Sequence, residues 1–150
     1  MRVAVASDHA GLPIKDTVLE TLAALGCEVE YLGTESPTSV DFPDYAERVG
    51  RKLQSGEADR GIALCGSGVG VCIAANKMQG VRAAICHDTY SAGQGVEHDG
   101  MNVLCLGGRI LGTAVVPGLV TAFIQAEFQR EERFIRRLNK VERLESESHA

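Results

Sequence analysis

A cysteine and three alternating glycines follow an apolar run in the segment ALCGSGVGVCIAANK, residues 63–77. Ordered glycine costs conformational entropy, so three glycines in five residues indicate a backbone path that side chains would spoil. Backbone N–H groups in such a loop, at the start of a helix, suit an anion or a developing oxyanion. Cys65 could supply a base or nucleophile there, because a helix N-terminus favours the thiolate. The alternatives are a tight turn without a ligand and a cysteine that only packs in the core.

The glycine spacing does not fit the common phosphate-binding loops. A Walker loop ends in Gly-Lys-Ser/Thr, and Val71 occupies the lysine position. The dinucleotide fingerprint is GxGxxG after the first strand, whereas this chain has GxGxG after the third. A cysteine-phosphatase loop would need arginine six residues beyond Cys65, where Val71 again stands. We therefore expect an anion or oxyanion site of another kind.

Other reactive side chains follow the remaining predicted strands. Asp8 and His9 come after the first strand, residues 87–88 after the fourth, and Arg109 after the fifth. The carboxyl ends of parallel strands lie at one edge of a sheet, where ligands bind. We therefore expect these groups to converge with Cys65.

The segment EERFIRRLNK places Arg133 and Arg137 four residues apart. On a helix their guanidinium groups share one face and could bind a single phosphate. The alternative is a solvated face on which neighbouring glutamates pair with them. The sequence has no HExxH and no CxxC, and its histidines are scattered, so we expect no metal ion.

These residues require a scaffold in which strands and helices alternate. Short apolar runs predict strands at 3–6, 28–32, 61–64, 81–85 and 102–106. Helical spacing predicts helices at 11–25, 45–53, 71–79, 88–96 and 113–126. A charged segment at 129–145 keeps an apolar stripe and should dock as a C-terminal helix. The pattern predicts a three-layer α/β, Rossmann-like fold with a five-stranded parallel sheet. We expect one domain at 1–145 and a disordered tail at 146–150.

Composition narrows the class of protein. The chain has 150 residues, 45% of them hydrophobic, and a net charge of −5, which argues against general nucleic-acid binding. No apolar stretch approaches the roughly 18 residues of a membrane span, and the N-terminus has no signal-peptide layout. Five cysteines without a CxxC pair favour reduced thiols over a disulfide framework or a thiol redox centre. We expect a soluble, cytoplasmic protein.

Four motifs together resemble one enzyme family. SDHAG, CGSGVG followed by AANK, EHDGMNVLCLGGR and EERFIRR are similar, in this order, to ribose-5-phosphate isomerase B and the galactose-6-phosphate isomerase subunits. The resemblance runs from residue 2 to about 145. It implies a metal-independent aldose–ketose isomerase without a cofactor, a homodimer or homotetramer whose sites are shared between chains. Ribose 5-phosphate, of the pentose phosphate pathway, is the first expected substrate. A tetrose or hexose phosphate, and a non-catalytic flavodoxin-like module that binds an anion or nucleotide, are the alternatives.

The resemblance also implies roles for single residues. Cys65 would be the base, Ser67 would assist it, and His98 would open the sugar ring. The implied substrate-binding residues are Asp8, His9, Gly66, Ser67, Gly68, Val69, Gly70, Asp99, Arg109, Arg133 and Arg137. The family commonly has Asn where this chain has Asp99, and His where it has Phe134. Both positions bear on sugar length and phosphate placement, so the chemistry is better determined than the substrate.

Overall fold

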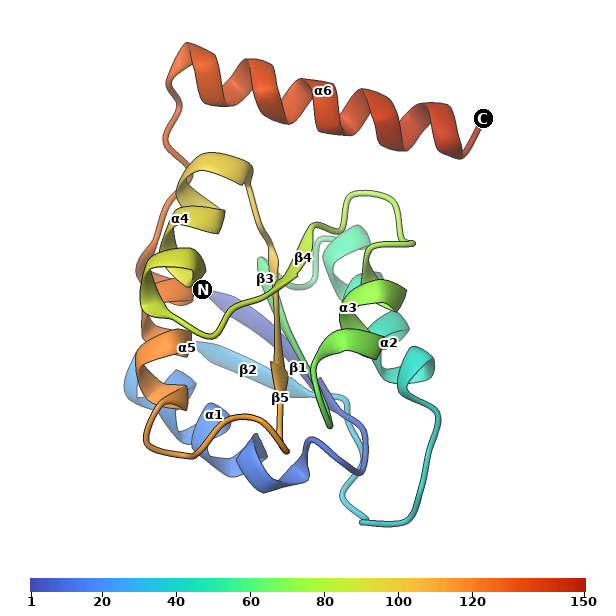
Figure 1. Ribbon diagram of the computed structural model, residues 1–150, viewed down its shortest axis with the longest axis vertical. Helices are drawn as coiled ribbons and strands as arrows, with labels where there is room; N and C mark the ends of the chain where they lie inside the picture. Colours follow the sequence, from blue (N-terminus) through green and yellow to red (C-terminus); the bar gives the residue numbers. More distant parts are fainter.

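Five strands and six helices form the protein, in a computed structural model that describes all 150 residues. The strands are β1 (Arg2–Ser7), β2 (Glu28–Tyr31), β3 (Arg60–Cys65), β4 (Ala83–Ile85) and β5 (Val103–Gly107). The helices are α1 (Leu12–Ala24), α2 (Phe42–Gln54), α3 (Val69–Ala75), α4 (Thr89–Asp99), α5 (Val116–Gln125) and α6 (Glu132–Ser148). The predicted α/β fold with a five-stranded sheet and a C-terminal helix is confirmed (Figure 1).

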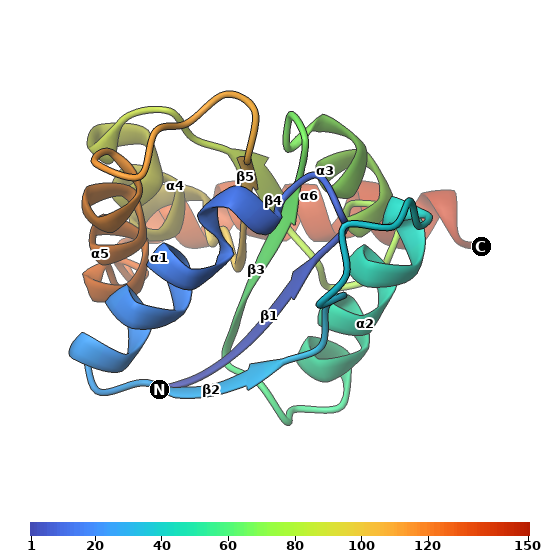
Figure 2. The ribbon, with the colours of Figure 1, turned by 90° about the horizontal axis from the view of Figure 1, so that it is seen from below.

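All strand pairs in the sheet are parallel, in the order β2-β1-β3-β5-β4. Every residue of β5 is buried, as is all of β3 except its first residue, as expected for strands covered on both faces. Helices α1, α4 and α5 cover one face, and α2 and α3 cover the other (Figure 2). The sheet therefore separates two apolar cores. It leaves the two ends of the strands free for loops.

The two cores differ in the size of their side chains. On the side of α1 and α5 the core holds Phe123, Ile14 and Leu22, all fully buried. On the side of α2 and α3, alanines and valines predominate, and this core also contains the thiols of Cys65 and Cys105. Since β3 ends at Cys65 and α3 begins at Val69, the first turn of α3 lies next to the end of β3. No helix is both long and apolar enough to cross a bilayer.

Helix α4 extends further than the sequence pattern indicated. The predicted helix ends at 96, whereas α4 continues to Asp99 and is capped by Gly100 with φ of 65°. A left-handed cap of this kind favours glycine, and the chain then turns directly into β5. As a result His98 and Asp99 lie in the last turn of a helix. The sequence pattern had placed them in a loop.

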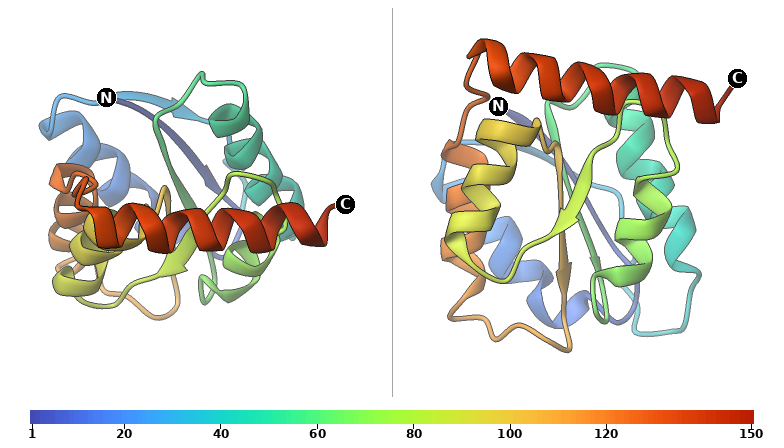
Figure 3. Two further views of the ribbon diagram at one scale, coloured as in Figure 1. Left: turned by 90° about the horizontal axis from the view of Figure 1, so that it is seen from above. Right: turned by 45° about the horizontal axis from the view of Figure 1, so that its top comes forward.

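Helix α6 lies outside the three layers and runs across the end of the sheet where β5 begins (Figure 3). Of its apolar stripe only Phe134 is buried, while Val141 and Leu144 are 50% and 59% exposed. The predicted burial of its apolar stripe is therefore complete at the first turn only. The helix also continues to Ser148, past the expected end of order at 145. Near its far end the Glu145 carboxylate accepts the N–H of Gly80 at 3.0 Å.

Candidate active site

The loops after β1, β3 and β5 interlock at the carboxyl edge of the sheet. The N–H of Asp8 donates to the carbonyl of Leu64 at 3.0 Å, and the N–H of Gly108 donates to the carbonyl of Cys65 at 2.8 Å. A Cβ atom on Gly108 would lie 2.5 Å from the carbonyl oxygen of Ala10, so only glycine allows this approach. We call this surface, formed by residues 8–11, 65–70 and 107–109, the rim.

Cys65 lies at the end of β3, 5% exposed, with its sulfur turned into the glycine loop. The N–H of Gly68 donates to its Sγ at 3.1 Å, and Gly68 has the positive φ, 81°, that starts α3. Beside it the Ser67 hydroxyl accepts the N–H of Val69 at 3.2 Å. Four further N–H groups of the loop donate to no protein acceptor: Gly66, Ser67, Gly70 and Val71. A thiol thus lies beside several free backbone donors.

Asp8 and His9 add one acceptor and one donor to the rim. Asp8 is buried, and its Oδ1 accepts the N–H groups of Ala10 and Gly11 at 2.8 and 3.1 Å. Its Oδ2 has no protein partner and can accept a hydroxyl. His9 Nδ1 accepts the N–H of Val40 at 3.2 Å, so the proton of the neutral ring is on Nε2. The pair therefore suits a ligand rich in hydroxyl groups.

Arg109 brings a positive charge to the rim. A Cβ atom added to Gly66 would lie 3.5 Å from Cδ and Nη1 of Arg109, so the side chain lies directly over the glycine loop. Its own N–H donates to the Gly66 carbonyl at 2.9 Å. No carboxylate forms an ion pair with its guanidinium. The group is free to attract an anionic ligand.

The remaining predicted site residues form a second cluster, at the junction of α4 and α6. The ring of His98 stacks on Phe134, with centroids 4.2 Å apart and an interplanar angle of 11°. The guanidinium carbons of Arg133 and Arg137 lie 4.7 and 6.0 Å from the centre of the same phenyl ring. Asp99 follows His98 at the end of α4. We call these five residues the α4–α6 cluster.

One chain does not bring the rim and the α4–α6 cluster together. Cys65 lies opposite Gly107 in the sheet, and four residues earlier Gly61 lies opposite Val103. At about 3.3 Å per residue, β5 alone separates these levels by about 13 Å. His98 precedes β5 and lies at its amino end, while the rim lies at its carboxyl end (Figure 1). The predicted site residues of one chain therefore form two groups at opposite ends of the sheet.

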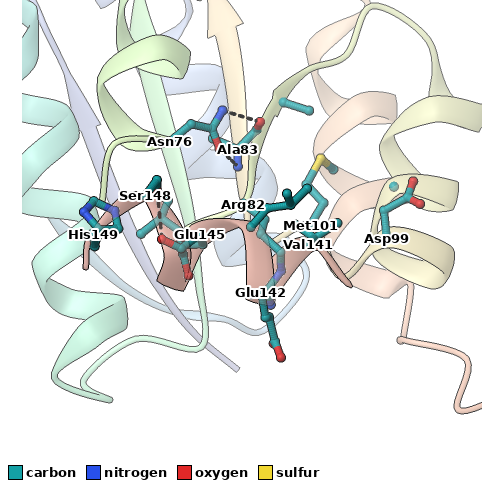
Figure 4. Close-up of a pocket in the computed structure, with 14 residues that line it drawn as sticks. Asn76, Arg82, Ala83, Asp99, Met101, Val141, Glu142, Glu145, Ser148 and His149 are labelled. Carbon is teal, nitrogen blue, oxygen red and sulfur yellow. Dashed lines mark hydrogen bonds between the residues drawn. The ribbon is translucent and has the colours of Figure 1, made fainter. Parts of the chain in front are cut away.

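A cavity of about 590 Å³ lies beneath α6 (Figure 4). Val141 and Leu144 of α6 line one side of it, and Arg82 and Met101 line it from the body of the protein. It contains Asp99 but none of the rim residues. The cavity is thus the uncovered underside of α6 and not a chamber for the thiol.

Three other thiols, those of Cys72, Cys86 and Cys105, have shifted pKa values. The pKa of Cys72 is lowered to about 7, chiefly by a hydrogen bond with the Cys105 thiol, whose own pKa is raised well above its usual range. Burial raises the pKa of Cys86 to about 11. No three His, Cys, Asp or Glu side chains gather as ligands of a metal ion would.

Gln94 was not singled out by the sequence. Its amide nitrogen lies 3.0 Å from Nδ1 of His98, one helical turn further along α4. Spacing of i and i+4 allows such a pair on any helix, so the only available signal was this spacing to a candidate histidine.

A family model and several known proteins match most of this chain. A family model described as Ribose/Galactose Isomerase matches residues 3–141. Ribose-5-phosphate isomerase B of Escherichia coli is 38% identical over 128 residues, 85% of this chain and 86% of that protein. D-erythrulose-4-phosphate isomerase of Pectobacterium atrosepticum is 35% identical over 130 residues, 86% of each chain. The structure of ribose-5-phosphate isomerase B from Clostridium thermocellum superposes with a TM-score of 0.94 at 39% identity and covers 99% of both chains.

Proposed function

This chain belongs to the ribose/galactose isomerase family, and we propose that it interconverts an aldose phosphate and a ketose phosphate through an enediolate. Ribose 5-phosphate and ribulose 5-phosphate are the first candidates. The relative named D-erythrulose-4-phosphate isomerase makes a four-carbon sugar phosphate the second. The observation that carries the proposal is the Cys65 thiol beside four backbone N–H groups that have no protein acceptor.

The reaction moves one proton between neighbouring carbons. Cys65, as the thiolate, takes the proton from C2 of the open-chain aldose, and the electron pair shifts to the carbonyl oxygen on C1. The resulting enediolate is stabilised by the free N–H groups of Gly66, Ser67 and Gly70 in this loop, where one such donor can contribute about 3 kcal/mol. The thiol returns its proton to C1, and the Ser67 hydroxyl carries the proton of O2 to O1. Every step is a proton transfer, so no cofactor or metal ion enters the scheme.

The remaining site residues bind the hydroxyl and phosphate groups of the substrate. Asp8 and His9 bind hydroxyls at the rim, and Arg109 adds positive charge there. Arg133 and Arg137 bind the phosphate, while His98 donates a proton to the ring oxygen when the sugar opens. Asp99 lies next to His98 and contributes to the discrimination between sugars.

We propose that the rim of one chain and the α4–α6 cluster of a second chain make each complete site. The separation of about 13 Å along the sheet supports this arrangement, because a five-carbon sugar phosphate must touch both groups at once. The exposed apolar residues of α6 support it as well, since a second copy would cover Val141 and Leu144. A symmetric dimer then contains two equivalent sites.

The decisive experiment is turnover of ribose 5-phosphate by Cys65→Ala, measured as ribulose 5-phosphate formed in the presence of EDTA. Loss of a base that acts in the transition state should abolish kcat and leave substrate binding nearly unchanged. Cys72→Ala is the matched control and should keep the wild-type kcat. Near-normal kcat in Cys65→Ala would assign the base to another residue. Binding of the sugar phosphate by the wild-type protein without turnover would favour the non-catalytic module.

A further inference from the structure

We propose that Gln94 is a positioning residue for His98: its amide donates to Nδ1 and so keeps the proton of the neutral ring on Nε2. The inference rests on the proposed function for its kinetic consequence only. The protonation of the ring can be measured on the protein without any substrate.

The contact itself is specific. Gln94 Nε2 lies 3.0 Å from His98 Nδ1, and both residues are partly buried on the same face of α4. A side-chain amide nitrogen carries two hydrogens, and its lone pair is delocalised into the carbonyl group, so it donates and does not accept. Nδ1 must then accept, and the neutral imidazole carries its hydrogen on Nε2.

Nothing else around the ring fixes its protonated nitrogen. The face of His98 lies against Phe134, a stack that sets the plane of the ring but forms no hydrogen bond. Arg133 and Arg137 lie against the phenyl ring, and neither forms a hydrogen bond with the imidazole nitrogens. Asp99, its neighbour on α4, forms no hydrogen bond with it. Phe134 therefore orients the ring, and Gln94 decides which nitrogen bears the proton.

This orientation has a chemical consequence for ring opening. Ring opening breaks the bond between C1 and the ring oxygen: the ring oxygen takes a proton from Nε2 of His98, and the anomeric hydroxyl releases its proton to water as C1 becomes the aldehyde carbon. Water then returns a proton to Nε2. Nδ1 is already occupied by Gln94, so Nε2 is the nitrogen left to meet the sugar. With the hydrogen on Nε2, His98 can donate to the ring oxygen at once. With the hydrogen on Nδ1, the same nitrogen would present a lone pair and could not donate.

Nitrogen-15 NMR of the imidazole side chains tests the assignment directly in the native protein. The chain has only four histidines, and His98→Asn identifies the signal of His98 by its disappearance. We expect the neutral ring of wild-type His98 to carry its hydrogen on Nε2. Gln94→Leu should give a mixture of both tautomers, and Gln94→Glu should move the hydrogen to Nδ1, because a carboxylate can only accept.

Kinetics supply the second measurement. Gln94→Leu should lower kcat/KM for ribose 5-phosphate about fivefold to tenfold, the effect of one lost hydrogen bond in the transition state. Gln54→Leu is the matched control: it removes a glutamine that donates to the Gln79 carbonyl at 2.8 Å on α2, on the other face of the sheet. The control should keep the wild-type kcat/KM, and circular dichroism should show both variants folded.

Two results overturn the proposal. One is a wild-type His98 whose hydrogen resides on Nδ1, and the other is a Gln94→Leu protein with the wild-type tautomer. Neither result depends on turnover. Inactivity on every sugar phosphate would refute the proposed function, and the NMR measurement would still decide the role of Gln94.

Discussion

Mixing two inactive variants should restore activity if the site is shared between chains. Cys65→Ala damages the rim, and His98→Ala damages the α4–α6 cluster, at the other end of the sheet. In the proposed dimer each site would take its rim from one chain and its α4–α6 cluster from the other. A mixed dimer then has one site with both defects and one site with neither.

The expected recovery follows from random pairing. Half of the dimers are mixed, and each mixed dimer has one intact site of two, so activity should reach about a quarter of the wild-type value. The assay is ribulose 5-phosphate formation after the two proteins have exchanged subunits under mild denaturant, with exchange followed by native mass spectrometry. Each variant carried through the same treatment alone gives the background.

A second mixture serves as the control. Arg109 lies over the Gly66 loop of the same chain, so Cys65→Ala and Arg109→Ala damage the same rim. In their mixed dimer every site keeps one defective rim, and no activity beyond the two backgrounds should appear. Failure of the first mixture to recover, with exchange demonstrated, would place Cys65 and His98 of one site on the same chain and refute the two-chain arrangement.

Two further predictions concern charged side chains. Arg133→Ala should lower kcat/KM for the phosphorylated sugar about tenfold to a hundredfold, since a charge-assisted hydrogen bond contributes about 1.5–3 kcal/mol, and should leave the poor turnover of unphosphorylated ribose unchanged. Equal kinetics of the two proteins on the phosphorylated sugar would indicate instead that Arg133 lies on a solvated face of α6. The second concerns Asp59, whose pKa Arg2 lowers to about 2 through a hydrogen bond. A folded-state pKa below the unfolded value of about 3.9 gives stability that is present above that value and lost as pH falls through about 2. Thermal melts should therefore show Asp59→Asn less stable than wild type at pH 7, with the difference shrinking steadily as pH falls from about 4 through about 2; a difference that stayed constant over this range would contradict the ion-pair explanation.

The rim could be predicted from the sequence because the carboxyl ends of all strands in a parallel sheet lie at the same edge. Reading where the first, third and fifth strands end was enough to bring Asp8, Cys65 and Arg109 together. The interlocking of the loops was not predictable in this way. It depends on the close approach of Gly108 to Ala10, which is a contact between segments almost a hundred residues apart.

The α4–α6 cluster could be predicted only in part. Placing His98 before the fifth strand implied that it lies far from Cys65, and the structure has it at the amino end of β5. Its stacking on Phe134 and its bond with Gln94 depend on the last turn of α4, which the sequence pattern ended three residues too early. Apolar periodicity is weak in that turn, and the left-handed Gly100 that closes it is a local signal that periodicity does not detect.

The apolar stripe of α6 shows what periodicity can and cannot state. Spacing of three and four residues at Phe134, Leu138 and Val141 predicts one face that must be buried, and it does not say by which chain. Within one chain only Phe134 is covered, and Val141 and Leu144 remain at least half exposed. Fully burying such a side chain contributes about 1.5–3 kcal/mol, so covering the exposed halves of both would contribute on the order of 2 kcal/mol to association. Periodicity thus specifies a face that needs covering, and the second copy that we propose to complete the site would also cover this face.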